Sequence, residues 1–391
     1  MQTPMPMPMP TDLPVDPTVL NRMSRRFRQF ADQDGQDDPL YAVLARCMAD
    51  DPRLCGLLAA APSGQQLPVL LLAAIHDCVL DAEVPASALH AYYPTAGGTR
   101  LPDESLPEAL LAFVHAHRDR LLHTVRTRST QTNEVGRCGV LRVALQALMQ
   151  RLDLGAQAPQ PVALFDFGCS AGLNLSVQDY GYDDGWDLRP AVDPAAPTIR
   201  GTWRRSPPAG LRGPDRWRVT ETLGVDLSPV EVSDERATRW LRACVWPHDA
   251  HRGERLGQAL EWARHRPHRL ISSQDGLQVL TDWVGSLPGP VLPVMINTWV
   301  LAYLDEEQRR SLTHRVTALI RERGLAWISA EAGKFAPVPV LPQGSGQEPP
   351  ETTTLWTLHW RARQGECGTP LAWSHAHGKW MDWVTEEDDD I

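Results

Sequence analysis

The pattern of apolar and polar positions divides the chain into two parts. Before Pro161, apolar residues recur at the three- and four-residue intervals of amphipathic helices, and Pro, Asp and Gly separate the successive stretches. These stretches lack the strict alternation of a half-buried strand. We therefore predict an all-helical N-terminal domain over residues 18–155. The expected helices cover residues 21–30, 40–48, 53–60, 67–80, 106–122 and 135–152.

From Pro161 onward, short apolar runs alternate with amphipathic stretches, which is typical of α/β proteins. We predict alternating strands and helices in a domain over residues 156–391. The five expected strands cover residues 162–167, 217–225, 269–273, 291–296 and 325–329. One helix is expected directly after Gly172, and the others cover residues 234–245, 252–265, 276–284 and 305–323. The closing β segments are residues 352–361 and 370–380.

Several segments fall outside this scheme. Residues 1–17, in which Pro and Met alternate, are predicted to be a disordered tail. Residues 183–215 are rich in Trp, Arg, Pro and Gly and are predicted to form an inserted hairpin or flap. Such an insertion either covers a bound substrate or is an ordinary surface hairpin. Residues 335–350 read as a Pro/Gly/Gln linker, and residues 385–391 as an acidic, solvated end.

Composition and charge narrow the functional classes. The net charge of −10 over 391 residues argues against general binding to nucleic-acid backbones. The seven cysteines form no C-x-x-C pair, which favours a reducing compartment. The two His-x-His pairs, at His115 and His375, have no third ligand nearby, so we predict no metal. The absence of a signal peptide and of a bilayer-spanning apolar run predicts a cytoplasmic protein without membrane binding. The sequence does not set the oligomeric state.

The strongest candidate for a binding site is the turn after the first expected strand. The strand ends with Asp166, and the next five residues have the order G-x-S-x-G. Small residues at a strand–turn–helix junction let a ligand approach the main chain and reach its free N–H groups. The five residues of the turn are Gly168, Cys169, Ser170, Ala171 and Gly172.

The same order of residues has other interpretations. G-x-S-x-G is also the nucleophile elbow of α/β-hydrolases, which would make Ser170 a nucleophile and require a base such as His314 or His359. The acid two positions before the first glycine fits an elbow poorly. A third interpretation is a glycine-rich turn between core elements that binds no ligand.

Two resemblances bear on this choice. Asp166 and the turn resemble the first motif of class I S-adenosylmethionine-dependent methyltransferases, (D/E)-x-G-x-(G/S)-x-G. Together with this turn, the segments QTNEVGRC (131–138), GVDLSP (224–229) and LRACVWPHDAHR (241–252) resemble the uncharacterised bacterial family called domain of unknown function 2332. This second resemblance extends over nearly the whole chain. It implies a Rossmann-like, class I methyltransferase fold, in which the five strands are parallel and an antiparallel pair closes the sheet, and S-adenosylmethionine as cofactor.

The resemblance assigns expected roles to residues at the strand ends. Asp166 and residues 168–172 would hold the methionine end of the cofactor, and Asp226 would accept hydrogen bonds from the ribose hydroxyls. Leu227 would pack on adenine, with Asp275 and Gly276 at the adenine edge. Asp226 and Asp275 are also placed to cap helices. A ribose-binding acid is usually found about twenty residues after the glycine turn; here Asp226 follows the turn by about sixty residues, because the insertion lies between them.

Candidates for substrate contact lie at other strand ends. Asn297 and Trp299 follow the fourth strand, and Tyr303 lies one turn further. Core packing is the preferred account of Trp299, and Glu331, which ends the fifth strand, is a weaker candidate of the same kind. Glu134 and Arg137 precede the expected sheet, share one helix face and would either pair, cap or contact substrate.

Three functions therefore remain open from the sequence. The first is a methyltransferase that acts on a small molecule or a protein side chain and whose catalytic base is not identified. The second is a Rossmann-like module that binds the cofactor without catalysis, because no (N/D)-P-P-Y acceptor motif is present. The third is a serine hydrolase that uses Ser170.

Overall fold

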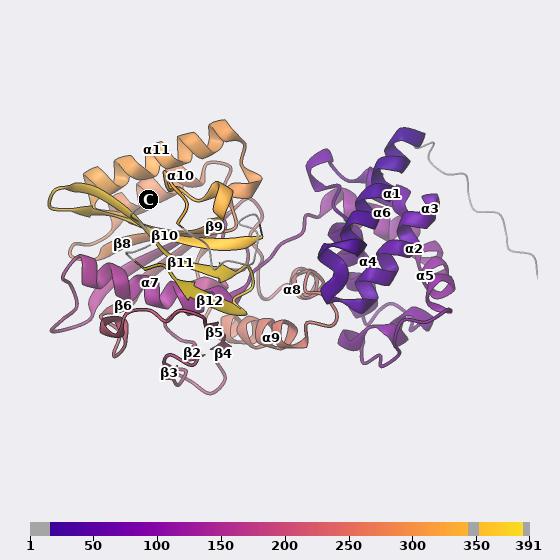
Figure 1. Ribbon diagram of the computed structural model, residues 1–391, viewed down its shortest axis with the longest axis horizontal. Helices are drawn as coiled ribbons and strands as arrows, with labels where there is room; N and C mark the ends of the chain where they lie inside the picture. Colours follow the sequence, from indigo (N-terminus) through magenta and orange to yellow (C-terminus); the bar gives the residue numbers. More distant parts are fainter. Residues whose placement is uncertain (1–15, 343–351, 386–391) are drawn as a thin grey trace, which may run out of the picture. The chain divides into compact units, whose positions relative to one another are not determined.

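The chain forms two compact units (Figure 1). The computed structural model describes residues 16–342 and 352–385. One unit comprises the residues up to Thr132 together with Glu235–Glu254, and the other comprises Asn133–Asp234 and the residues from Arg255 onward. The contacts thus place the boundary after Thr132 rather than at the expected residue 155. Residues 1–15 of the predicted tail, residues 343–350 of the linker and the acidic end after Thr385 lie outside the described residues.

The first unit is helical, as its apolar spacing predicts. Aspartates precede three of its helices, and the carboxylates of Asp16, Asp38 and Asp51 accept backbone N–H groups as caps before a proline in the first turn. The stretch expected as one helix over 106–122 is divided at His117. The helices are α1 (Pro17–Asp32), α2 (Pro39–Asp50), α3 (Pro52–Cys55), α4 (Pro68–Leu80), α5 (Leu106–Ala116) and α6 (Arg118–Thr127). Short 3₁₀ turns are η1 (Asp34–Asp37), η2 (Gly56–Ala60), η3 (Ser63–Gln65), η4 (Ala88–Tyr92) and η5 (Pro94–Ala96).

A later segment of the chain completes this unit. Helix α8 (Glu235–Ala243) places Trp240, 2% exposed, in the helical core, and the indole N–H donates to the Ser129 carbonyl at 3.0 Å. Arg239 pairs with Asp77 at 3.0 Å and with Asp81 at 3.1 Å. Helix α9 (Ala250–His265) then carries the chain on to the second unit after Glu254. The helical unit is therefore built from two separate stretches of sequence.

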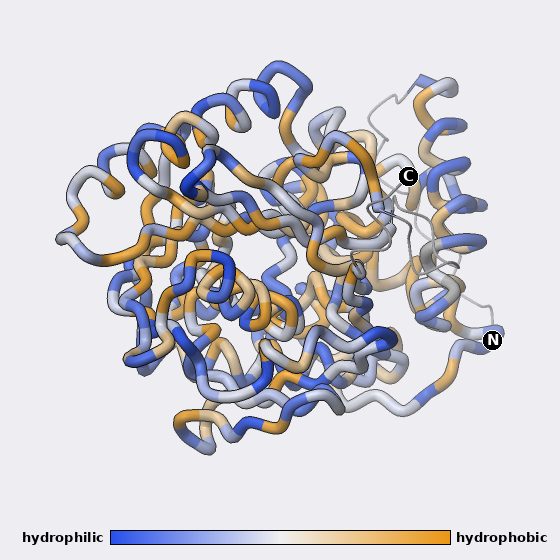
Figure 2. Tube along the Cα trace, turned by 60° about the vertical axis from the view of Figure 1, so that its left-hand side comes forward, coloured by the Kyte–Doolittle hydropathy of each residue, from blue (hydrophilic) through white to orange (hydrophobic). Residues whose placement is uncertain are grey.

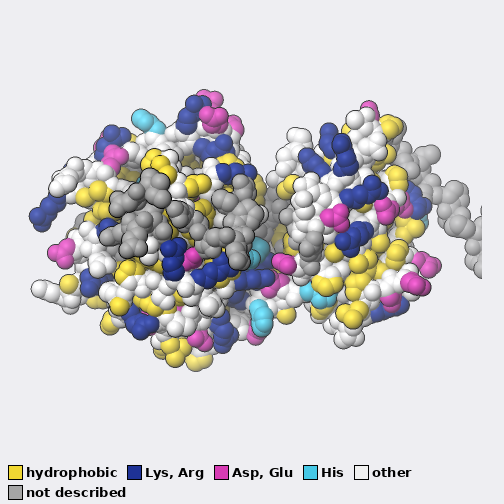
Figure 3. Space-filling model, viewed as in Figure 1, with side chains coloured by type: hydrophobic (Ala, Val, Ile, Leu, Met, Phe, Trp, Pro, Cys, Tyr) yellow, Lys and Arg dark blue, Asp and Glu magenta, His cyan; other side chains and the backbone are white. Residues whose placement is uncertain are grey.

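The arginine-rich helix α1 is held within its own unit. Arg28 pairs with Asp50 at 2.9 Å, and both Arg22 and Arg26 donate to Gln66. On the face shown in Figure 3, the Lys and Arg side chains of the first unit lie among acidic and hydrophobic ones. These contacts fit a solvated, internally paired face.

The second unit contains a nine-stranded sheet of order β5-β12-β11-β10-β9-β8-β1-β6-β7. Its parallel strands are β1 (Gln160–Phe167), β6 (Trp217–Asp226), β7 (Leu270–Ser272), β8 (Leu292–Thr298) and β9 (Ala326–Ala332). Antiparallel strands follow as β10 (Thr353–Ala362), β11 (Gly365–His375) and β12 (Trp380–Trp383), and β5 (Thr202–Trp203) pairs with β12 at the edge. The predicted α/β class, with parallel strands and a C-terminal antiparallel pair, is confirmed.

Helices cover both faces of the parallel strands (Figure 1). Helices α10 (Gly276–Ser286) and α11 (Glu306–Arg323) lie on one face, over Phe165, Met295 and Trp327, which are at most 1% exposed and occupy one row of the register. Helix α7 (Cys138–Arg151) lies on the other face. In Figure 2, hydrophobic segments accordingly pass through the middle of this unit. Burial on both faces explains why these strands read as continuous apolar runs.

The chain departs from expectation directly after the glycine turn. Instead of the predicted helix there is one 3₁₀ turn, η7 (Leu173–Ser176). Two tyrosine hydroxyls occupy carbonyls that a continuing helix would use: Tyr180 donates to Leu173 at 2.6 Å and Tyr182 donates to Val177. Strands β2 (Gly181–Asp183), β3 (Leu188–Arg189) and β4 (Thr198–Arg200) then form a small sheet, before η8 (Ala209–Leu211). The insertion is therefore a small sheet rather than a single hairpin.

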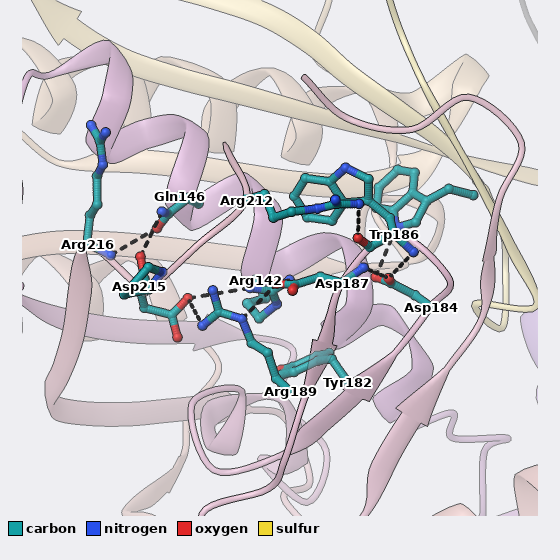
Figure 4. A network of polar contacts seen from close by, with 12 residues as sticks. Arg142, Gln146, Tyr182, Asp184, Trp186, Asp187, Arg189, Arg212, Asp215 and Arg216 are labelled. Atoms are coloured by element: carbon teal, nitrogen blue, oxygen red, sulfur yellow. Dashed lines mark hydrogen bonds and ion pairs between the residues drawn. The ribbon is translucent and has the colours of Figure 1, made fainter. Parts of the chain in front are cut away.

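A buried ion network attaches this insertion to α7 (Figure 4). The Arg142 side chain, 2% exposed, lies 3.1 Å from the Asp187 carboxylate and 3.5 Å from that of Asp215. Arg189 contacts the same two carboxylates at 2.8 and 2.9 Å. Gln146 on α7 donates to the Pro214 carbonyl at 3.1 Å. The path from β1 to β6 thus contains this ion network and short strands in place of a packed crossover helix.

The remaining short elements are η6 (Val135–Arg137), η9 (Leu301–Tyr303) and η10 (Gly333–Phe335).

Among residues 16–342 and 352–385, none of the helices combines the length and the apolar character needed to cross a bilayer.

The ion network gives a test of the fold. We expect Arg142→Met to lower the free energy of unfolding by about 3 kcal/mol, because it removes a buried guanidinium and leaves two partly buried carboxylates with one arginine. The matched control is Arg200→Ala in the same insertion, because the Arg200 side chain is 75% exposed and lies 3.9 Å from Asp183. The control should change the free energy by less than about 0.5 kcal/mol. Urea unfolding measures both, and equal effects would contradict the structural role of Arg142.

Candidate functional site

Two aspartates meet at the carboxyl ends of neighbouring strands. Strands β1 and β6 pair in parallel, with Asp166 opposite Gly224 and Phe167 opposite Val225, so Asp226 follows at the same edge. The carboxylate of Asp226 is close enough to raise the pKa of Asp166. The structure therefore brings together the two acids that the sequence analysis assigned to one site.

The turn between them has the backbone of a glycine-rich loop. Gly168, Ser170 and Gly172 have φ values of +79°, +51° and +68°. A side chain at Gly168 would overlap that of Val300, so this position needs glycine for space as well as for conformation. The turn is thus close to the loop that follows β8.

The amide groups of the turn are mostly engaged within the protein. Gly168 and Cys169 donate to the Val225 carbonyl at 2.8 and 3.1 Å. Ser170 donates to the Asp226 carboxylate at 2.9 Å, and Gly172 donates to the Cys169 carbonyl at 2.8 Å. The expectation that small residues leave these four N–H groups available to a ligand is wrong. The helix N-terminus that would have added further donors is also missing.

The ligand-binding potential of the turn lies instead in oxygens without partners. Asp166 is 1% exposed, and neither of its carboxylate oxygens has a hydrogen bond among the described residues. Burial, and secondly the Asp226 carboxylate, raise the pKa of Asp166 to about 7, against the opposing charge of Arg137. A buried carboxyl group in this state is costly unless a cationic partner arrives.

Two further oxygens beside the turn are in the same condition. The Ser170 hydroxyl and the Asn133 side-chain oxygen are buried and have no partner among the described residues. The Asn133 amide nitrogen donates to the Cys169 carbonyl at 2.7 Å, which places this side chain at the turn. Asn133 escaped the sequence analysis as a ligand because it precedes the turn by more than thirty residues, and spacing carries no signal over that distance.

The residues expected around the adenosine fall into two groups. Asp226 accepts the N–H groups of Ser170 and Ser228, each at 2.9 Å, and Leu227 beside it is 64% exposed. Asp275 caps α10 by accepting the Gln278 N–H at 2.9 Å and pairs with Arg315 at 3.2 Å. The capping interpretation therefore holds for Asp275. Gly276 provides room for the Phe167 ring, because a Cβ atom at position 276 would lie 2.8 Å from a ring carbon of Phe167.

The end of β8 is tied into the core. Asn297 is 0% exposed, donates to Glu331 at 2.6 Å and accepts the Trp327 indole N–H at 2.6 Å. Glu331 also accepts the Val300 N–H at 2.8 Å, and burial raises its pKa to about 7. Asn297 thus serves the structure and does not face a substrate as expected.

The neighbouring aromatic residues are differently placed. Trp299 has a φ of +58°, and its indole N–H donates to Thr354 at 2.7 Å, which fixes the ring. Tyr303, in η9, is 64% exposed. Of the three residues expected near substrate at this strand end, Trp299 is therefore the one held in a strained and defined orientation.

Glu134 and Arg137 have separate partners. Glu134 accepts the Gly136 N–H at 2.8 Å, as a cap, and the Arg255 guanidinium at 2.6 Å. Arg137, 4% exposed, donates to the Ala376 carbonyl and to the Thr298 hydroxyl, both at 3.1 Å. Its charge opposes the rise that burial causes in the pKa values of Asp166 and Glu331.

The serine hydrolase interpretation loses its support. A nucleophilic serine needs a base within hydrogen-bond reach, and the Ser170 hydroxyl contacts none among the described residues. His359 is stacked on Trp327 at 5.0 Å, and burial lowers its pKa to about 4. His314 lies on the outer helix α11.

Comparison with known proteins identifies the family. The family described as "Uncharacterized protein conserved in bacteria (DUF2332)" matches residues 24–383, and the chain belongs to it. The resemblance stated from the sequence is confirmed. No curated protein matches the sequence.

Solved methyltransferase structures overlap the chain weakly. The bifunctional kinase-methyltransferase WbdD shares 12% identity over 55% of this chain and 32% of its own, with a TM-score of 0.25. The sugar N-methyltransferase KedS8 from Streptoalloteichus sp ATCC 53650 shares 11% over 59% and 70%, with a TM-score of 0.21. An S-adenosylmethionine-dependent methyltransferase from Clostridium acetobutylicum ATCC 824 shares 10% over 72% and 84%, also at 0.21. The match spans about a third of the WbdD chain, and at these scores the overlap by itself indicates no function.

The buried carboxyl group of Asp166 predicts a pH dependence of stability. Its pKa is 3.8 ordinarily and about 7 in the folded protein, so the folded state keeps a proton that the unfolded chain releases. The free energy of unfolding therefore falls as the pH rises from about 4 to 7. We expect Asp166→Asn to be more stable than wild type at pH about 8, by at most about 4 kcal/mol, and equally stable near pH 4.

Urea unfolding at several pH values measures this difference. Glu331, with a pKa of about 7, adds the same slope to both proteins, so their difference isolates Asp166. A constant difference at all pH values would contradict the unpaired state of this carboxyl group.

Proposed function

We propose that this member of the DUF2332 family binds S-adenosylmethionine at the ends of β1 and β6 and transfers its methyl group to a small molecule or a protein side chain. The observation that carries the proposal is Asp166, whose two carboxylate oxygens are buried without partners beside the glycine turn. A cofactor with an ammonium group supplies the missing cation. The site thus fits the amino-acid end of S-adenosylmethionine.

The other residues at this edge fit the rest of the cofactor. Each carboxylate oxygen of Asp226 accepts one backbone N–H group, and each can accept a further hydrogen bond from a ribose hydroxyl. Leu227 presents an exposed apolar surface for adenine. Gly168 keeps the turn close to the loop after β8, where the bound sulfur would lie. Asp275 is not part of this proposal, because its cap and its ion pair account for it.

The protein's part in the reaction is to hold and orient. When bound, the cofactor supplies an electrophilic methyl group on a sulfonium, and no metal is needed for the transfer. The Trp299 ring is fixed by its hydrogen bond to Thr354, and the Arg137 guanidinium lies over it, 6.0 Å from the ring centroid. Arg137 holds the loop after β8 through Thr298 and so keeps that ring beside the strand ends.

A second candidate is a module that binds the cofactor without transferring the methyl group. It is favoured because the amide of Asn297, the strand-end residue expected from the sequence to meet the acceptor, is engaged in the core instead. Methyl transfer to any member of a broad panel of amines, hydroxyls and carboxylates would decide for the enzyme.

The proposal also covers the class of acceptor and the cellular location of the protein. The net charge of −10 supports an acceptor other than a nucleic acid. The seven cysteines are all free, which supports a cytoplasmic location, where thiols stay reduced.

Calorimetry with S-adenosylhomocysteine tests cofactor binding. We expect micromolar-range affinity for wild type and a loss of about 10- to 100-fold in Asp166→Asn, because a charge-assisted hydrogen bond to the ammonium group is removed. Asp226→Ala should lower the affinity by about the same factor, because it removes the acceptor for the ribose hydroxyls and the hydrogen bond that holds the Ser170 N–H. The matched control is Asp275→Asn, which keeps a capping side chain and should bind like wild type. Undetectable binding of both S-adenosylmethionine and S-adenosylhomocysteine to wild type would refute the proposal.

A further inference from the structure

The turn between β11 and β12, residues 376–379, lies at the same edge of the sheet as the candidate site. Strand β10 begins beside the end of β9, and β11 ends beside the start of β10, so the turn follows at the carboxyl edge of the parallel strands. Arg137 donates to the Thr298 hydroxyl at the end of β8 and to the Ala376 carbonyl in the turn, both at 3.1 Å. One buried guanidinium therefore joins the turn to the loop after β8.

Basic side chains gather around this turn. The rings of His375 and His377 have their centres 5.3 Å apart, and those of His375 and Trp380 are 6.4 Å apart. The guanidinium of Arg204, which follows β5, lies 3.7 Å from the centre of the Trp380 ring. Lys379 belongs to the same turn, and both Lys379 and Arg204 are exposed. We call His375, His377, Lys379 and Arg204 the basic wall.

The charge around the basic wall is one-sided, although the whole chain carries a net charge of −10. Residues 199–206 and 367–385, which supply the wall and the strands beside it, contain a single acid, Asp382. Asp382 is 3% exposed and pairs with Arg205 at 2.8 Å. In Figure 3, Lys, Arg and His side chains accordingly gather over the part of the second unit that Figure 1 labels β5 and β12. Such a concentration of cations attracts anionic ligands.

The turn that carries the wall is held in a defined conformation. The His377 N–H donates to the His375 Nδ1 atom at 3.0 Å, so the neutral His375 ring carries its proton on Nε2 as a donor. Gly378 has a φ of +70°, and a Cβ atom there would lie 2.6 Å from the Gly136 carbonyl oxygen. The Arg255 guanidinium lies 3.4 Å from the His377 carbonyl oxygen. The donors of the turn are therefore positioned before any ligand arrives.

We propose that the basic wall binds the methyl acceptor, and that this acceptor is a small molecule with a carboxylate or phosphate group. This inference rests on the proposed function, since it names the acceptor class of the same site. In the order of the strands, Trp299 after β8 lies between the glycine turn of β1 and the wall after β11. The distances within the wall, from 3.7 to 6.4 Å, suit one or two anionic groups rather than an extended acidic peptide.

Calorimetry with citrate and with inorganic pyrophosphate, at physiological ionic strength, tests the wall. We expect wild type to bind at least one of them with submillimolar affinity, and the tighter anion distinguishes a carboxylate from a phosphate. Arg204→Gln and Lys379→Gln should each weaken that anion about three- to tenfold, because each removes one charge-assisted contact. The matched control is Arg310→Gln on α11, whose side chain is 73% exposed and lies 3.7 Å from Glu306. It should bind the anion like wild type.

The same titrations are repeated on protein saturated with S-adenosylhomocysteine. An acceptor site is separate from the cofactor, so the affinity for the anion should stay equal or rise. Competition between the two ligands would assign the wall to the cofactor's own carboxylate and overturn the inference. An oligoglutamate peptide that binds more tightly than either small anion would overturn it as well, in favour of an acidic protein segment.

The outcomes separate this inference from the proposed function. Absence of anion binding to wild type, or equal losses in Arg204→Gln and Arg310→Gln, would overturn the acceptor site and leave cofactor binding intact. Absence of cofactor binding to wild type would refute the proposed function, and with it the acceptor role of the wall, even where the anions bind.

Discussion

The hydrogen bond from the Ser170 N–H to the Asp226 carboxylate is the interaction on which the candidate site depends. Together with the two bonds to the Val225 carbonyl, it joins the glycine turn of β1 to the end of β6. Burial, and secondly the Asp226 charge that holds the turn, raise the pKa of the neighbouring Asp166. One carboxylate therefore fixes the turn and disfavours the charged form of the other, and the proposed cofactor site rests on this pair.

This arrangement differs from the usual way in which a strand–turn–helix junction binds a ligand. There, free N–H groups and the helix dipole attract a negative group. Here the turn is followed by a single 3₁₀ turn, its amides are mostly engaged, and its unsatisfied atoms are acceptors. The groups without partners at this junction are thus acceptors rather than donors, as the proposed cofactor's ammonium group would require. The chain between β1 and β6 has the ion network around Arg142 and a small sheet where the helix was expected.

The loop after β8 gives the site its second wall. Glu331 binds both Asn297 and the Val300 N–H, and this network lies under the strained residue Trp299. Val300 in turn fills the space that glycine leaves at position 168. The two walls are therefore coupled by packing: the core residues that seemed candidates for substrate contact instead determine where the aromatic ring and the glycine turn lie.

The sequence by itself determined the α/β class and the strands, because apolar runs are local patterns, and its motif resemblance singled out Asp166 and Asp226, which the pairing of β1 with β6 brings to one edge. Tertiary structure decided the rest. The helix expected after Gly172 is replaced because the hydroxyls of Tyr180 and Tyr182 bind its carbonyls, and α8 joins the first unit because Trp240 and Arg239 find partners there. Asn133 reaches the turn across a gap that spacing cannot encode. Each of these outcomes depends on a hydrogen bond or a packed side chain between residues distant in the chain, and a pattern of neighbouring residues does not contain that information.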